Sequence, residues 1–254
     1  VQSEQDLDIL LYLLEHRRLE PANLADFRDR MHAWMEYDGY PSIGMPRSPL
    51  ASFVYEWAGI EQATYLLLDH PDRVGRILEL LEKQEQPIID AVCAVAPPLI
   101  HFPDNLTSDN FAGLYDAYMG PAHVRRLDRL HSAGIKVVVH LDGTIRGLLP
   151  KLVESGFDGI EALTPAPVGD VDVDEIQDLA DSESVILWGG VPGAMFSPPY
   201  TWADMQRHIE QVLECWNGRP FVLGVADQVP PDGDISFCRR IADMLSRDSV
   251  ATPP

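Results

Sequence analysis

The sequence predicts an α/β fold in which parallel strands alternate with helices, either as a parallel sheet or as a (β/α) barrel. The first observation is a series of short apolar runs that end in polar residues or glycine, at residues 99–105, 137–143, 159–164, 185–190 and 221–227. The second is that stretches of helical length, with apolar residues at helical spacing, lie between these runs. Strand and helix in regular alternation are typical of a parallel sheet or a barrel.

The clearest predicted strand lies at residues 137–143. It begins with three valines, which suit a strand covered on both faces. His140 and Asp142 follow, and such residues are costly to bury unless they reach a cavity, a metal ion or each other. In parallel α/β folds the active site lies at the carboxyl ends of the strands. We therefore expect both side chains at the mouth of a cleft.

The other expected elements follow from apolar spacing and helix-ending glycines. Helices are expected over residues 5–16, 24–35, 115–133, 145–154, 174–179, 202–216 and 235–245, and a weak first strand over residues 41–45. The expected apolar stripes of the first two helices are Asp6, Leu7, Ile9, Leu10, Leu13 and Leu14, and Phe27, Met31, Trp34 and Met35. Arg125, Arg126 and Arg129 are expected on the solvated face of their helix.

The number of strands falls short of a closed barrel. About six are recognisable, whereas a barrel of this class has eight strands and typically about 250 residues. We expect residues 1–254 to form a single, N-terminally truncated barrel domain that lacks the first two strands and begins inside a larger protein. Residues 1–40 are expected to be a helical lead-in.

Composition limits the classes of function. With 46% hydrophobic residues and no apolar run near eighteen residues, the 254-residue chain reads as a soluble protein with one large core and no membrane span. The three cysteines are far apart and show no CxxC spacing, which disfavours disulfides and thiolate zinc clusters and fits a cytoplasmic location. The net charge of −21 disfavours nucleic acid as a partner.

The strand ends supply the candidate site residues. His140 and Asp142 point to the same side of their strand, and Glu161 and Asp227 from later strands would complete a metal site for Mg²⁺, Mn²⁺, Fe²⁺ or Zn²⁺. The alternative is that these four residues only make hydrogen bonds and caps. No Walker lysine, GxGxxG or GxSxG motif is present, which disfavours nucleotide binding by those routes and serine-hydrolase chemistry.

Two further groups have two interpretations each. His101, Asp104 and Asn105 contact substrate, or the latter two form an Asx turn that leads into a helix. Trp188, followed by two glycines, is a shelf for a ligand or an aromatic residue of the core.

Several motifs in succession resemble the uroporphyrinogen decarboxylase superfamily. They are DNLTS at 104–108, HSAG at 131–134, HLDG at 140–143, ESGFDGIEAL at 154–163, ILWGGVPG at 186–193 and GVADQVPPDGDI at 224–235. The resemblance covers nearly the whole chain. The chain resembles the family's barrel from the third strand onward. It implies a (β/α)8 barrel with its cleft at the carboxyl ends of the strands.

The superfamily includes decarboxylases that act on a tetrapyrrole without a cofactor, and zinc methyltransferases that move methyl groups between corrinoid proteins and thiols. This chain resembles the corrinoid-linked methyltransferases more, since the arginine-rich amino-terminal motif of the decarboxylases has no counterpart and their GNLDP-like loop reads GGVPG. The methyltransferase HxC matches His140 and places Asp142 at the cysteine. Glu161 matches a glutamate of the methionine synthases, and Asp227 takes the place of the last-strand cysteine.

The resemblance implies three hypotheses. The first is methyl transfer between a corrinoid protein and a small molecule, assisted by a metal, zinc in the family, at His140, Asp142, Glu161 and Asp227, with His101 and Asn105 orienting the substrate. The second is cofactor-free decarboxylation of a tetrapyrrole, which needs a cationic cleft, although Arg47 and Arg146 are the chief basic residues of the predicted loops. The third is a binding module or an incomplete fragment, whose open sheet edge would favour a homo-oligomer.

Overall fold

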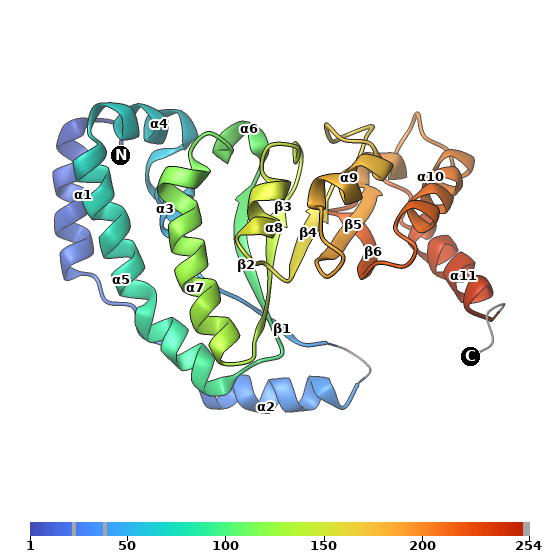
Figure 1. The fold of residues 1–254 in the computed structure, drawn as a ribbon, viewed down its shortest axis with the longest axis horizontal. Coiled ribbons are helices and arrows are strands. Elements are labelled where there is room, and N and C mark those ends of the chain that lie inside the picture. Colours follow the sequence, from blue (N-terminus) through green and yellow to red (C-terminus); the bar gives the residue numbers. More distant parts are fainter. Residues whose placement is uncertain (22–23, 38–39, 251–254) are drawn as a thin grey trace. The chain divides into compact units, whose positions relative to one another are not determined.

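A computed structural model describes residues 1–21, 24–37 and 40–250, with side chains up to residue 246 (Figure 1). Within these residues, six parallel strands alternate with helices, as expected for a partial (β/α) barrel. The chain divides into two compact units, residues 1–140 with 154–158, and residues 141–153 with 159–254. Residues 22–23 and 38–39 of the expected helical lead-in lie outside the described residues.

The first unit contains the strands β1 (Ser42–Gly44), β2 (Leu99–Leu106) and β3 (Lys136–Leu141, its last residue in the second unit), in that order. β1 and β2 are parallel, with Ser42 opposite Leu99 and Gly44 opposite His101. The three valines of β3 are all buried, which confirms the expected strand. The polar residues Asp104 and Asn105, predicted to end the second strand, lie inside it, because β2 continues to Leu106.

The helices of the first unit include a region to which the sequence analysis assigned no structure. In chain order they are α1 (Glu4–His16), α2 (Leu24–Met35), α3 (Pro49–Ser52), the π-helix η1 (Phe53–Ala58), α4 (Ile60–Asp69), α5 (Pro71–Val95), α6 (Ser108–Phe111), the π-helix η2 (Tyr115–Met119) and α7 (Gly120–Ser132). α5 contains Pro87, and the charged residue Glu85 lies within its buried apolar stripe, so its helical pattern is interrupted in the sequence. The helix expected over 115–133 is η2 followed by α7.

α1 shows how burial selects among apolar residues. A capping box between Ser3 and Asp6 starts the helix, and α1 packs against α5 (Figure 1). Its buried residues are Leu7, Leu10, Leu11 and Leu14, whereas Ile9 and Leu13 are 59% and 49% exposed. The predicted stripe was therefore wrong at Ile9 and Leu13. The stripe predicted for α2 is largely exposed too, since only Met31 of its described residues is buried.

The second unit contains the parallel strands β4 (Gly159–Leu163), β5 (Ile186–Pro192) and β6 (Phe221–Ala226), also in chain order. Its helices are α8 (Leu149–Glu154, whose last residue belongs to the first unit), α9 (Val173–Ala180), the 3₁₀ helix η3 (Gly193–Phe196), α10 (Trp202–Cys215) and α11 (Ser236–Val250). α8 begins four residues later than predicted. The backbone N–H of Ile145 donates instead to the Asp170 carboxylate at 2.7 Å.

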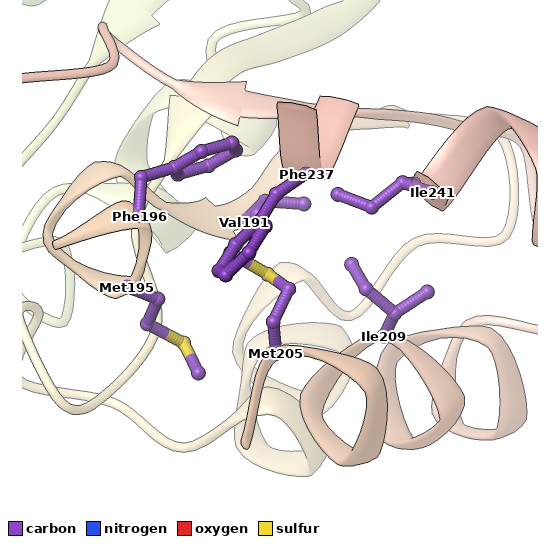
Figure 2. Close-up of a cluster of buried hydrophobic side chains, with 7 residues drawn as sticks. All are labelled: Val191, Met195, Phe196, Met205, Ile209, Phe237 and Ile241. Carbon is purple, nitrogen blue, oxygen red and sulfur yellow. The ribbon is translucent and has the colours of Figure 1, made fainter. Parts of the chain in front are cut away.

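A compact apolar cluster joins β5, η3, α10 and α11 in this unit. Figure 2 shows its seven buried side chains, Val191, Met195, Phe196, Met205, Ile209, Phe237 and Ile241. Capping boxes start α9 at Asp172 and α10 at Thr201. None of the helices in the described part of the chain is long and apolar enough to span a bilayer.

Candidate active site

In the first unit, two predicted site residues lie together on neighbouring strands. The rings of His101 on β2 and His140 on β3 have centroids 6.1 Å apart and meet edge to face at 82°. Both side chains are half-buried. The sequence predicts both residues at strand ends, with His101 as a substrate contact and His140 as a metal ligand. Their adjacency was available from the order of the strands, because β2 and β3 are neighbours.

Asp104 is fully buried two strand positions before the end of β2. Its Oδ1 accepts a hydrogen bond from the backbone N–H of Ser48 at 2.7 Å, and its Oδ2 lies 2.8 Å from Nε2 of His123. Burial by itself would raise the pKa of Asp104, but the bonds with His123 and Ser48 and the charge of Arg126 outweigh burial and lower it. Both carboxylate oxygens have protein partners, and the predicted contact with substrate stays a prediction.

The bond to Asp104 begins a buried polar chain that the sequence analysis missed. His123 Nδ1 lies 3.1 Å from the Tyr115 hydroxyl, which lies 2.8 Å from Ser155 Oγ. The chain can satisfy its donors with His123 either neutral or protonated, because the two hydroxyl groups can reverse direction. Burial raises the pKa of Tyr115, which keeps its hydroxyl protonated. No local motif marks these residues, which come together only through folding.

Asn105 has a different environment from its neighbours in β2. Asp104 and Leu106 are fully buried, whereas Asn105 is exposed and has a φ of +52°. Its backbone carbonyl accepts a hydrogen bond from the Tyr55 hydroxyl at 2.6 Å. Asparagine adopts this left-handed conformation more readily than most residues. The backbone thus turns the Asn105 amide away from the core at the carboxyl end of β2.

Arg126 corrects the prediction that the three arginines of α7 lie at the surface. Arg125 and Arg129 have side chains 58% and 51% exposed and pair with Glu82 and Asp90. Arg126 is only 1% exposed and pairs with Glu85, which is also buried. A buried guanidinium needs such a partner, and Glu85 is on α5, far away in sequence. Charge spacing within α7 could not reveal it.

In the second unit, Asp142 directly follows β3 and is half-buried, and Glu161 is half-buried within β4. The pairing of β4 with β5 shifts register between Ile160 and Leu163, and Ala162 has a φ of +66°. Such a bulge changes the direction of neighbouring side chains and is frequent beside active sites. The sequence predicted a carboxylate in this strand, but nothing in it indicated the bulge.

Asp227 follows β6, is exposed and has a φ of +65°. The next residue touches η3 closely, since a Cβ added to Gly193 would lie 2.1 Å from the carbonyl oxygen of Gln228. Glycine at position 193 thus permits the close backbone approach that places the segment after β6.

Trp188 is half-buried in β5. This exposure is compatible with both interpretations of its sequence context, a shelf for a ligand and an aromatic residue of the core. A Cβ on Gly224 would lie 3.4 Å from the indole Nε1 of Trp188, so glycine in β6 makes room for the ring. At Gly189, which has a φ of +135°, a Cβ would lie 2.6 Å from the carbonyl oxygen of Leu163. These glycines fix the close packing of β5 with β4 and β6, and a ligand contact of Trp188 stays a prediction.

The donors at the strand ends are imidazoles and carboxylates. The three cysteines instead lie on helices, Cys93 in α5, Cys215 in α10 and Cys238 in α11. Arg146, one of the two basic loop residues, pairs with Glu175 at 3.0 Å. Any metal held at these strand ends would therefore have nitrogen and oxygen ligands, a set that suits Zn²⁺, Mn²⁺ and Fe²⁺.

Comparisons with known proteins agree with this architecture. No curated protein sequence matches the chain. A solved structure, a methyltransferase from Methanosarcina mazei, superposes with a TM-score of 0.64 over 94% of this chain and 69% of that chain. The sequence identity is 16%, so this likeness shows a shared fold. The profile of the family described as uroporphyrinogen decarboxylase (URO-D) matches residues 30–247. The chain therefore belongs to the uroporphyrinogen decarboxylase family.

Proposed function

We propose that this protein is a metal-assisted methyltransferase, which moves a methyl group between a corrinoid protein and a small acceptor or donor. Membership of the uroporphyrinogen decarboxylase family and the fold shared with a methyltransferase support this choice of reaction. The observation that carries the proposal is the pair of half-buried imidazoles of His101 and His140, 6.1 Å apart on neighbouring strands. Imidazole is the commonest metal ligand in proteins, and the active sites of barrel enzymes lie towards the carboxyl ends of the strands.

The proposed metal ligands are His140, Asp142, Glu161 and Asp227. Their residue types support the assignment, because imidazole and carboxylate groups bind divalent transition metals. A bound divalent ion would act as a Lewis acid and lower the pKa of a coordinated thiol or hydroxyl group. Zinc is the first candidate because of the resemblance to zinc methyltransferases. Without thiolate ligands, the set is harder and more anionic than a site with two cysteines.

The remaining strand-end residues would position the small molecule. The Asn105 amide is exposed at the carboxyl end of β2 and can both donate and accept hydrogen bonds. His101 would orient the acceptor, and its imidazole can take the proton that the acceptor loses. A corrinoid protein, as the methyl carrier, would dock where these residues lie and leave after transfer.

The first test is the metal content of protein purified without chelators. We expect near-stoichiometric zinc or another divalent metal in the wild type, and its loss in a variant that combines His140→Ala with Asp227→Asn. The matched control combines His32→Ala with Asp232→Asn, which changes the same residue types at positions outside the proposed set. Metal retained by the His140/Asp227 variant would contradict the proposed ligands.

The second test is methyl transfer from a methylated corrinoid protein to small thiols and alcohols, followed by the change in corrinoid absorbance. The proposal predicts transfer by the wild type and loss with the metal. Metal-free protein that decarboxylates a tetrapyrrole would instead support the cofactor-free alternative. Protein that binds a ligand but catalyses neither reaction would support the binding-module hypothesis.

A further inference from the structure

The loop that follows β1, residues 46–48, is held at both ends by buried charged residues of the first unit. Arg126 Nη2 donates to the backbone carbonyls of Pro46 and Arg47, both at 3.2 Å. The backbone N–H of Ser48 donates to Asp104 Oδ1 at 2.7 Å. Arg126 and Asp104 are 1% and 0% exposed. Two buried, charge-assisted contacts therefore fix the position of three residues beside the carboxyl end of β2.

Three buried donor groups at this loop lack a hydrogen-bond acceptor among the described residues. They are Arg47 Nε, Ser48 Oγ and Arg126 Nη1. Buried polar groups nearly always have partners, and each exception requires an explanation. Two of the three belong to guanidinium groups, which only donate, and a hydroxyl group can donate as well. A partner for each of the two guanidinium groups is therefore an acceptor, and an acceptor also suits the hydroxyl group.

Arg47 differs from the arginines of α7 in its surroundings. Arg125, Arg126 and Arg129 each pair with a carboxylate. Arg47 makes no ion pair within the described part of the chain, and its guanidinium carbon lies 5.3 Å from the centre of the Tyr55 ring. The chain has a net charge of −21, so an anion approaching this protein needs a local positive group. Arg47 is half-buried and offers that charge at a strand end.

We propose that Arg47, together with the hydroxyl group of the next residue, Ser48, recognises a carboxylate group of the substrate. This inference rests on the proposed function, and it names the substrate as a carboxylate-bearing acceptor or donor. A guanidinium binds a carboxylate through two parallel hydrogen bonds. A phosphate carries more charge than one guanidinium and one hydroxyl group balance, so a carboxylate is the better match.

The location of the loop relates this contact to the proposed chemistry. The backbone N–H of Met45 donates to the carbonyl of His101 at 2.9 Å, so the chain leaving β1 runs beside β2. Tyr55, on which the Arg47 guanidinium packs, also binds the carbonyl of Asn105. A substrate whose carboxylate is held by Arg47 would therefore lie along the edge that presents His101 and Asn105.

The test measures binding of glutarate and of its neutral analogue glutaramide by saturation-transfer NMR. The wild type is expected to bind glutarate saturably and glutaramide at least tenfold more weakly. Arg47→Gln should weaken glutarate binding at least tenfold. Arg47→Lys keeps the charge but loses the two parallel bonds, so it should bind with intermediate affinity at an unchanged unfolding temperature. Arg125→Gln, which alters an exposed arginine on α7, is the control and should bind as the wild type does.

Equal dissociation constants for the wild type and Arg47→Gln would overturn the inference, as would equal binding of glutarate and glutaramide or no saturable glutarate binding. Tighter binding of inorganic phosphate than of glutarate would overturn the choice of a carboxylate. A different result would contradict the proposed function. If Arg47-dependent glutarate binding is found without metal or methyl transfer, the carboxylate site stands and the methyltransferase proposal does not.

Discussion

Replacing Arg126 by methionine should remove most of the order around the loop after β1. In the wild type, the Arg126 guanidinium pairs with Glu85, binds two loop carbonyls and lies 5.0 Å from the centre of the Phe102 ring. Methionine keeps much of the side-chain volume but removes the cation that pairs with Glu85. The Glu85 carboxylate, which is only 3% exposed, would then be buried without a counter-charge. Methionine also leaves two carbonyls without a donor.

The magnitude follows from the burial of both partners. Breaking a buried ion pair by removing one partner costs about 3–5 kcal/mol. For a chain of this size each kcal/mol lowers the unfolding temperature by about 2–4 °C, so the expected decrease is roughly 6–20 °C. Arg125→Met, on the exposed side of the same helix, should cost at most about 1 kcal/mol, because an exposed pair contributes little.

The assay is urea unfolding followed by circular dichroism, for both single variants and for Arg126→Met combined with Glu85→Leu. The double variant removes both charges, so it should be more stable than Arg126→Met alone by about 2 kcal/mol or more. An Arg126→Met variant within about 1 kcal/mol of the wild type would refute the reasoning, because the pair would then not be desolvated.

Three further predictions concern other parts of the chain. Gly193→Ala places a Cβ 2.1 Å from the Gln228 carbonyl, so we expect a loss of about 1–3 kcal/mol in urea unfolding and weaker metal binding through displaced Asp227. An unchanged free energy of unfolding together with unchanged metal binding would contradict the close approach of residue 193 to the Gln228 carbonyl. Gly75→Ala, in α5 with open space around the new Cβ, should gain about 0.5–1 kcal/mol in the same unfolding measurement. Burial lowers the pKa of His208, whose neutral ring donates to the Gly190 carbonyl at 2.6 Å. The contribution of His208 to the free energy of unfolding is fully present above pH 6.5, the usual pKa of the ring. It is lost as the pH falls from there through the lowered pKa of the folded state, because the unfolded state binds the proton more tightly than the folded state does. A His208→Gln variant should flatten that part of a plot of unfolding free energy against pH, and a wild-type slope in the variant would assign the effect elsewhere.

The strands could be predicted from the sequence because each is marked by a short run of apolar residues within the strand itself. A run such as the valines of β3 suits only a covered strand, and all three are buried. The polarity of a parallel strand also places His140 and Asp142 towards its carboxyl end without further information. The helices were harder to predict where a proline or a charged residue interrupts the apolar stripe, and α5, with Glu85 and Pro87, was missed although it is 25 residues long.

The sequence by itself determined the fold class, the strand order along the chain and the residue types at the strand ends. Only the tertiary structure decided which charged groups are buried and which side chains meet. Arg126 looks like any surface arginine of α7 until Glu85 on α5 comes to lie against it. Asp104 acquires its partners from Ser48 and His123, which belong to other elements. The physical reason is that a single segment fixes backbone propensity, whereas the desolvation of a charge depends on neighbours that folding brings from distant segments.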